Sequence, residues 1–200
     1  CTASATILMT ENVVAPGSIN TSSSTICFGE PAAAIFNVVP ALGSGVIEYG
    51  WEASIDNGST FTPYPSSSNT NTLVNPGNLF QTTVFRRSAK STISSLTSCT
   101  EYSNLVTITV LPQVLGGTIT PTTLTICSGE IPPQLSVTGG SFGPGVSYKW
   151  EISSDGVSFT EISTATGQNY SPSSLNSTTF YKRVTTAGSG TASTCVAEST

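Results

Sequence analysis

Histidine is absent from this sequence, and charged residues make up only 8% of it, against roughly 25% in an average globular protein. Without histidine, the chain lacks the commonest general base and a common metal ligand. Six basic residues against eleven acidic ones give a net charge of −5, and no long basic run occurs, so the composition argues against nucleic-acid binding. No apolar run approaches the roughly 20 residues that a membrane-spanning helix needs.

Serine, threonine, glycine, proline and asparagine take the place of the missing charges. The residues that favour helices, namely Glu, Lys, Arg and Met, are scarce throughout. This composition is typical of an all-β surface protein with many turns. The length of 200 residues suits one large domain or two domains of about 100 residues each.

The only two tryptophans mark an internal repeat. Trp51 and Trp150 each lie in a Tyr-x-Trp-Glu segment that is followed by an Asn-Gly or Asp-Gly turn and then by phenylalanine. Further anchors recur in the same order: Thr25-Ile26-Cys27 with Thr125-Ile126-Cys127, Phe85-Arg86-Arg87 with Tyr181-Lys182-Arg183, and Cys99 with Cys195. The offset between copies falls from 100 residues at the first cysteine to 96 at the last, which indicates short loop deletions in the second copy.

The repeat predicts three segments. Residues 15–112 form a complete first repeat, and residues 113–200 form a second repeat that lacks its last strand. Residues 1–14 read as the last-strand tail of a preceding repeat, because Cys1-Thr2 and the strand-like run Thr6–Met9 resemble Cys99-Thr100 and the strand Val106–Val110. On this interpretation the sequence is a window from a longer chain. A lipidated N-terminal cysteine is the alternative.

Each copy contains about seven short strands separated by turn signals, with its tryptophan on the third strand. This pattern is typical of an immunoglobulin-like β-sandwich of roughly 100 residues. Because side chains alternate along a strand, we expect the face that carries the tryptophan and tyrosine to lie in the core. The predicted core residues are Trp51, Tyr49 and Phe61 in the first repeat and Trp150, Tyr148 and Phe159 in the second.

Five cysteines in a chain of this kind indicate an oxidising compartment. The repeat predicts the disulfides Cys27–Cys99 and Cys127–Cys195, with Cys1 paired outside this sequence. Each predicted bond would close a loop of about 70 residues at one end of its sandwich and contribute on the order of 4 kcal/mol. A metal site is disfavoured, because the chain has no histidine and no C-x-x-C motif.

Two groups of acidic residues invite a chemical interpretation. The turns at Asp56-Asn57-Gly58 and Asp155-Gly156 lack the alternating oxygen ligands of a calcium loop, so a plain hairpin is favoured. Glu48 and Glu52 could form a catalytic carboxylate pair, but Ser147 stands where the second copy would need the first carboxylate. An ion pair between Glu52 or Glu151 and the basic residues at 86–87 or 182–183 is favoured instead.

No base is placed to activate a serine or threonine nucleophile, so the sequence predicts no enzyme and no cofactor. Calcium binding at a domain joint stays open. The acidic residues that could contribute to it are Glu11, Glu30, Glu101 and Glu130.

The combined motifs Thr-Ile-Cys-x-Gly-Glu, Tyr-x-Trp-Glu, Thr-Thr-x-aromatic-basic-Arg and Cys-x-x-x-Ser resemble the Ig-like tandem repeats of giant Bacteroidota cell-surface adhesins, of the gliding-motility SprB type. The resemblance covers nearly the whole chain, although Phe85-Arg86-Arg87 departs from the usual Tyr-x-Arg. It implies a very long filament exported by type IX secretion and carried along the outer membrane. It also implies a location at the cell surface and no catalytic residues.

The leading hypothesis is a structural segment of such a filament, with neighbouring repeats as its partners and a polysaccharide or solid surface as its target. A carbohydrate- or surface-binding module, or an accessory region of a secreted hydrolase, are the alternatives. A deep aromatic pocket in only one copy would favour the binding module. The open edge of the second copy further predicts that residues 2–9 of another molecule fill it by strand addition.

Overall fold

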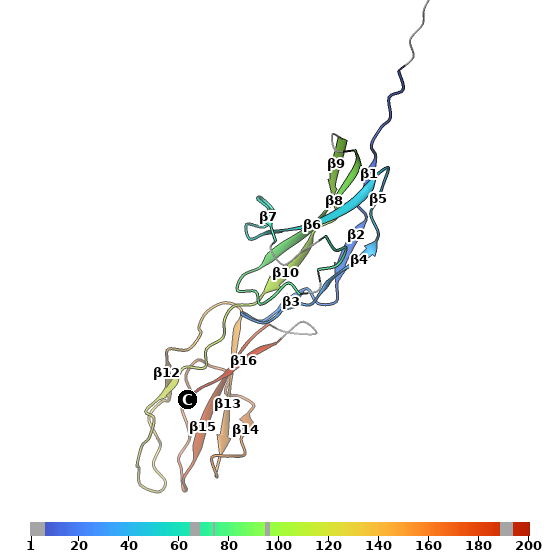
Figure 1. The fold of residues 1–200 in the computed structure, drawn as a ribbon. Coiled ribbons are helices and arrows are strands. Elements are labelled where there is room, and N and C mark those ends of the chain that lie inside the picture. Colours follow the sequence, from blue (N-terminus) through green and yellow to red (C-terminus); the bar gives the residue numbers. More distant parts are fainter. Residues whose placement is uncertain (1–6, 65–68, 74, 95–96, 189–193) are drawn as a thin grey trace, which may run out of the picture. The chain divides into compact units, whose positions relative to one another are not determined.

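A computed structural model describes residues 7–64, 69–73, 75–94, 97–188 and 194–200. The chain divides into two compact units, Cys1–Val110 (unit 1) and Leu111–Thr200 (unit 2) (Figure 1). The regular elements of the described residues are β-strands, as the composition predicts. None of the described residues forms a helix that is long and apolar enough to cross a membrane.

Unit 1 is built around a large sheet whose strand order is β3-β10-β8-β6-β7, with β9 paired to the far half of β8. Two small sheets, β2-β4 and β1-β5, accompany it. The strands are β1 (Val14–Ala15), β2 (Ser18–Thr21), β3 (Thr25–Ile26), β4 (Ile35–Val39), β5 (Leu42–Gly43), β6 (Val46–Ser54), β7 (Thr62–Pro63), β8 (Thr83–Ser94), β9 (Thr97–Tyr102) and β10 (Val106–Val110).

The core of unit 1 lies between the large sheet and the β2-β4 pair. Ile19 and Ile35 come from the small sheet, whereas Trp51, Phe85 and Ile108 come from β6, β8 and β10. Trp51 is 2% exposed, and its indole Nε1 donates a hydrogen bond to the carbonyl of Thr70 at 2.9 Å. The two sheets and the enclosed core make the β-sandwich that the strand pattern predicts.

Unit 2 repeats the central part of this arrangement. Its strands are β11 (Thr118–Thr120), β12 (Ser136–Thr138), β13 (Val146–Ser153), β14 (Thr160–Ile162), β15 (Phe180–Ala187) and β16 (Cys195–Glu198). The larger sheet has the order β14-β13-β15-β16, and β11 pairs with β12. Trp150 is completely buried against Ile119, Leu135 and Val137, and its Nε1 donates to the carbonyl of Gly167.

The N-terminal segment differs from its predicted structure. The described residues 7–12 form no strand, and Ile7, Leu8 and Met9 are each more than 80% exposed. Val14, assigned to the preceding repeat by its sequence, pairs with Gly43 of β5 and so belongs to the fold of unit 1. The rest of the predicted strand-addition segment, residues 2–6, lies outside the described residues.

Both hairpin turns close as predicted. The hydroxyl of Ser54 accepts from the Gly58 amide, and that of Ser153 accepts from the Gly156 amide. Asn57, Gly58 and Gly156 have φ values of 59°, 86° and 73°, a region in which asparagine and glycine are tolerated best.

Candidate functional site

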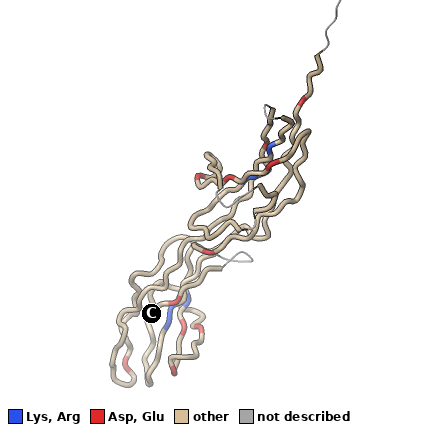
Figure 2. The backbone as a smooth tube through the Cα atoms, viewed as in Figure 1, with Lys and Arg blue, Asp and Glu red and all other residues tan. Residues whose placement is uncertain are grey.

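A buried arginine stands opposite the buried tryptophan in each unit. All six basic residues lie on β8, β13 and β15 (Figure 2), but they occupy two different environments. The register pairs Trp51 with Arg87 and Trp150 with Arg183, and both arginines are completely buried. Because alternate residues of a strand share a face, Arg87 lies on the same side of β8 as Phe85, which is the core side.

Arg87 ties together three segments of unit 1. Its Nη1 donates to Oδ1 of Asn37 at 2.7 Å and to the carbonyl of Asn71 at 2.9 Å, and its Nη2 donates to the carbonyl of Pro16 at 2.8 Å. The guanidinium also lies 4.9 Å from the ring centre of Tyr49. The arginine therefore joins β8 to β4, to the loop after β7 and to Pro16, which directly follows β1.

Arg183 makes the corresponding contacts in unit 2. Its Nη1 donates to the carbonyl of Gln168 at 3.1 Å, and its Nη2 donates to the carbonyl of Gly116 at 3.0 Å. Its guanidinium lies 4.6 Å from the ring centre of Tyr148. A Cβ on Gly140 would approach Nη2 of Arg183 to 2.6 Å, so the small residue leaves room for the guanidinium.

Neither buried arginine has a carboxylate partner in the part of the chain that the structure describes. Burial away from water lowers the pKa of both guanidiniums, and Tyr49 and Tyr148 oppose that shift. An arginine stays protonated even so. Its charge is balanced by oriented carbonyl dipoles and an aromatic face, which is an arrangement for holding segments in place.

The burial of these two arginines is not among the predictions from the sequence, although strand alternation carries a signal of it. The sequence predicts that both basic residues of each pair form an exposed ion pair with Glu52 or Glu151. Only the first of each pair, Arg86 or Lys182, has that role. The strand alternation that puts Phe85 in the core also puts Arg87 there. This signal is easily overlooked, because a basic residue in a strand is ordinarily expected on the exposed face.

The outer face of the large sheet carries the ion pairs. Nη2 of Arg86 lies 2.6 Å from Oε2 of Glu52, and its guanidinium is stacked between the rings of Phe61 and Tyr102 at 3.9 and 3.8 Å from their centres. Glu48, once considered as a catalytic carboxylate, faces Lys90 at 3.7 Å. The position of Phe61 corrects its predicted place in the core.

Unit 2 replaces the stacked arginine with a small network. Glu151 contacts Lys149 at 2.8 Å and Lys182 at 3.2 Å, and Lys182 also reaches Glu198 at 3.0 Å. Hydrogen bonds from the two lysines lower the pKa of Glu151, and Lys149 contributes most. Phe159 lies 4.7 Å from Nζ of Lys182 and so, like Phe61, packs outside the core cluster.

Tyr49 and Tyr148 are half-buried and belong to neither core cluster. They were predicted as core residues, but they cover the guanidiniums of Arg87 and Arg183 instead. Trp51 and Trp150 are the members of the predicted set that the core clusters contain.

The aspartates of the hairpin turns serve the turns themselves. Oδ1 of Asp155 accepts from the amides of Val157 and Ser158, both at 2.8 Å, and from the hydroxyl of Ser153. These hydrogen bonds, led by that from Ser158, lower the pKa of Asp155 from 3.8 to about 2. Hydrogen bonds from Ser54 and Thr60 likewise hold the pKa of Asp56 well below its usual range.

The remaining acidic residues form no metal centre in the described part of the chain. No group of three or more His, Cys, Asp or Glu side chains gathers there closely enough to hold a metal ion. Glu130 instead accepts a hydrogen bond from the backbone amide of Cys127 at 3.0 Å.

The cysteines do not pair as the repeat predicts. Cys27 and Cys195 are disulfide-bonded, whereas Cys99 and Cys127 have free thiols. The predicted bonds Cys27–Cys99 and Cys127–Cys195 are therefore both wrong, and neither repeat is closed by a disulfide between its own two repeated cysteines. Cys1 lies outside the described residues.

A comparison with known protein families gives two matches to one family, described as a domain of unknown function (DUF8696), over residues 15–112 and 115–199. These two spans divide the chain as the internal repeat does. A comparison of the chain with curated proteins finds no match.

Proposed function

The chain belongs to the family of domains of unknown function DUF8696, and on that premise we propose that it is a structural segment of a long, repetitive cell-surface adhesin. In this role the repeats extend a filament and resist unfolding, while chemistry and specific recognition are left to other parts of the protein. The tandem arrangement of two family members supports the proposal, because repeated small domains are a common way to build length.

The observation that carries this proposal is the buried tryptophan–arginine pair found in both units. Each guanidinium directs its hydrogen bonds to carbonyl or amide oxygens of its own unit, and each is completely buried. The guanidinium, whose burial costs each unit the most free energy, thus holds strands and loops of that unit together through its hydrogen bonds. A binding site would direct such a group towards a ligand.

The resemblance described above extends the proposal to a setting. We infer a giant adhesin of the gliding-motility SprB type in a Bacteroidota species, exported by type IX secretion and held at the outer membrane. Its partners would be neighbouring repeats and a polysaccharide or solid surface. Low charge suits a long array of similar units, because neighbouring repeats then repel one another little.

A rival role as a carbohydrate-binding module has one observation in its favour, namely an open groove in unit 2 that contains Phe180 and Tyr181. Unit 1 holds β10 in the corresponding place, paired with β3 on one side and with β8 on the other. The groove is therefore better explained as a position for a strand than as a site for a sugar ring.

The location can be tested with antibodies raised against the recombinant chain. Intact cells should be labelled, and mild external protease should remove the label while a periplasmic marker survives. Deletion of the gene should reduce attachment or spreading on a solid surface. A signal that appears only after the outer membrane is broken would contradict the proposal.

The mechanical role can be tested separately by pulling single molecules in the force microscope. With the disulfide-bonded Cys27 and Cys195 reduced, two unfolding events are expected, each lengthening the chain by roughly 30 nm, because an extended residue spans about 3.3–3.6 Å. Extension at low force with no discrete events would contradict a load-bearing role, whatever the location of the protein.

A further inference from the structure

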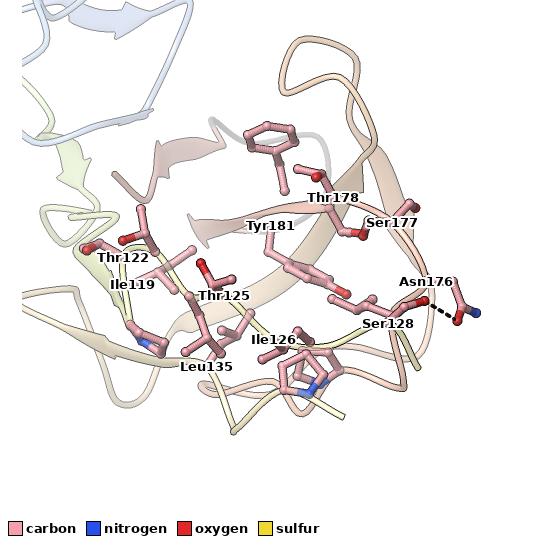
Figure 3. Close-up of a pocket in the computed structure, with 18 of the residues that line it drawn as sticks. Ile119, Thr122, Thr125, Ile126, Ser128, Leu135, Asn176, Ser177, Thr178 and Tyr181 are labelled. Carbon is pink, nitrogen blue, oxygen red and sulfur yellow. Dashed lines mark hydrogen bonds between the residues drawn. The ribbon is translucent and has the colours of Figure 1, made fainter. Parts of the chain in front are cut away.

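Arg183 and Thr185 of unit 2 carry buried donor atoms that the fold leaves unpaired. Both side chains are completely buried, and neither Nε of Arg183 nor Oγ1 of Thr185 has a hydrogen-bond partner in the described part of the chain. Buried polar atoms without a partner are rare in folded proteins and can mark a bound water or ion. Neither residue lines the open groove beside the start of β15 (Figure 3), so the two donors belong to a separate, enclosed site.

Unit 1 provides more acceptors for its buried guanidinium than unit 2 does. Arg87 donates four hydrogen bonds within its unit, one of them to Oδ1 of Asn37 at 2.7 Å. Arg183 donates two, although a guanidinium carries further N–H groups. The register of β2 with β4 and of β11 with β12 places Val137 where unit 1 has Asn37. Arg183 therefore lacks an amide acceptor that Arg87 has.

The buried hydroxyl on this face also occupies a different position in the two units. The strand registers place Thr185 of β15 where β8 has Ala89, next to the arginine on the core face. The buried hydroxyl of unit 1 belongs to Ser91, two residues further along β8, and its Oγ already has two hydrogen-bond partners. Because alternate residues share a face, the Cα atoms of Arg183 and Thr185 lie about 7 Å apart on one side of β15. Unit 2 thus places an unpaired hydroxyl beside an arginine that is short of acceptors.

The combination of these two donors favours a small anion over a water molecule. An arginine N–H can only donate, and a buried water would need acceptors for its own hydrogens as well. An anion accepts from the guanidinium and the hydroxyl alike, and hydrogen bonds between charged groups are the stronger kind. It also balances a buried charge that has no carboxylate partner among the described residues. Because both donors are completely buried, the ion must be small and must have lost its water shell.

We propose that unit 2 binds one monovalent anion of the size of chloride between Arg183 and Thr185. The ion accepts hydrogen bonds from Nε of Arg183 and Oγ1 of Thr185, and so supplies the acceptor that Asn37 supplies in unit 1. It is a structural part of unit 2 and not a ligand that a filament would recognise from outside, so this inference goes beyond the proposed function. Nε of Arg87 is unpaired as well, but Ala89 offers no hydroxyl beside it, so unit 1 binds no such ion.

The test follows the urea unfolding of the whole chain in sodium chloride and in sodium gluconate at the same ionic strength. Gluconate is too large to enter an enclosed site. In a Trp51→Phe background, Trp150 alone reports unit 2. At a chloride concentration about ten times its dissociation constant, the unfolding equilibrium constant of unit 2 should be about tenfold lower than in gluconate. In a Trp150→Phe background, Trp51 should report the same midpoint for unit 1 in both salts.

Thr185→Ala gives unit 2 the residue that unit 1 has in this place, and it should abolish the chloride response. Thr186→Ala, on the opposite face of β15, is the matched control and should keep that response. Bromide soaked into crystals should give an anomalous-scattering peak beside Arg183 in the parent chain and none in the Thr185→Ala variant.

Equal responses of the two units to chloride would overturn the proposal, because they would reflect a general effect of the salt. A unit 2 whose midpoint is the same in both salts would overturn it as well, and so would a chloride response that survives Thr185→Ala. A bromide peak without a chloride-dependent midpoint would mark an adventitious ion only, which also contradicts the proposal.

Discussion

The buried arginine of unit 1 offers the sharpest test of how these repeats are held together. Replacing Arg87 by methionine removes the guanidinium but keeps a side chain of similar length and apolar volume. Three short hydrogen bonds are then lost, to Oδ1 of Asn37 and to the carbonyls of Asn71 and Pro16, as is a longer one of 3.5 Å to the carbonyl of Val39. Phe85 and Trp51, the neighbours of Arg87 on the core face, keep an apolar contact.

Two effects of opposite sign determine the result. A hydrogen bond to a charged group contributes about 1.5–3 kcal/mol, so the loss of the three short bonds lowers the free energy of unfolding of the variant. Removing a buried charge, on the other hand, recovers a desolvation cost of several kcal/mol. The residues that carry the acceptor oxygens are only partly buried, so water can donate hydrogen bonds to some of these oxygens in place of the arginine. We therefore expect a net loss of about 2–3 kcal/mol.

Arg87→Lys should be at least as harmful as Arg87→Met. One ammonium cannot reach three acceptors that lie in different directions, and the buried charge remains. Arg86→Met is the matched control one residue away. It removes a partly exposed ion pair and should cost about 0–1 kcal/mol, to which the lost stacking on Phe61 and Tyr102 adds a similar amount.

The assay uses the single tryptophan of each unit. In a Trp150→Phe background, Trp51 alone reports the urea unfolding of unit 1. Arg87→Met should lower the midpoint of that transition, and Arg183→Met should leave it where it was. The reasoning would be refuted if Arg87→Met proved as stable as the parent, or if Arg86→Met cost more than Arg87→Met.

Two further predictions concern the turns and the cysteines. Because the folded state lowers the pKa of Asp155 from 3.8 to about 2, the stability that this carboxylate provides should be complete above pH 4 and be lost as the pH falls towards 2. In urea unfolding measured at several pH values, Asp155→Asn should therefore lose less stability between pH 4 and pH 2 than the parent chain does. An equal loss in the two proteins would contradict this prediction. Iodoacetamide applied to the native, unreduced chain should modify the exposed Cys127 first and the half-buried Cys99 more slowly, while Cys27 and Cys195 react only after reduction. A mass spectrum showing Cys27 joined to Cys99 would reverse the assignment of the cysteines.

Much of the fold was predictable because it depends on short-range patterns. The β-sandwich strands follow from residue alternation, the hairpins from Asp and Gly at positions of positive φ, and the duplication from the order of the repeated motifs. Trp51 and Trp150 could be assigned to the core because a large aromatic side chain in an alternating strand packs best on the buried face. Each of these inferences needs only neighbours in the sequence.

The sequence by itself thus determined the class of fold, the repeat and the strands that hold the tryptophans. Strand alternation points Arg87 and Arg183 to the core face, but the tertiary structure alone decided which distant oxygens accept their hydrogen bonds and so allow both guanidiniums to be buried. It also decided which cysteines are oxidised. These properties depend on contacts between residues far apart in the sequence, and no local pattern encodes them.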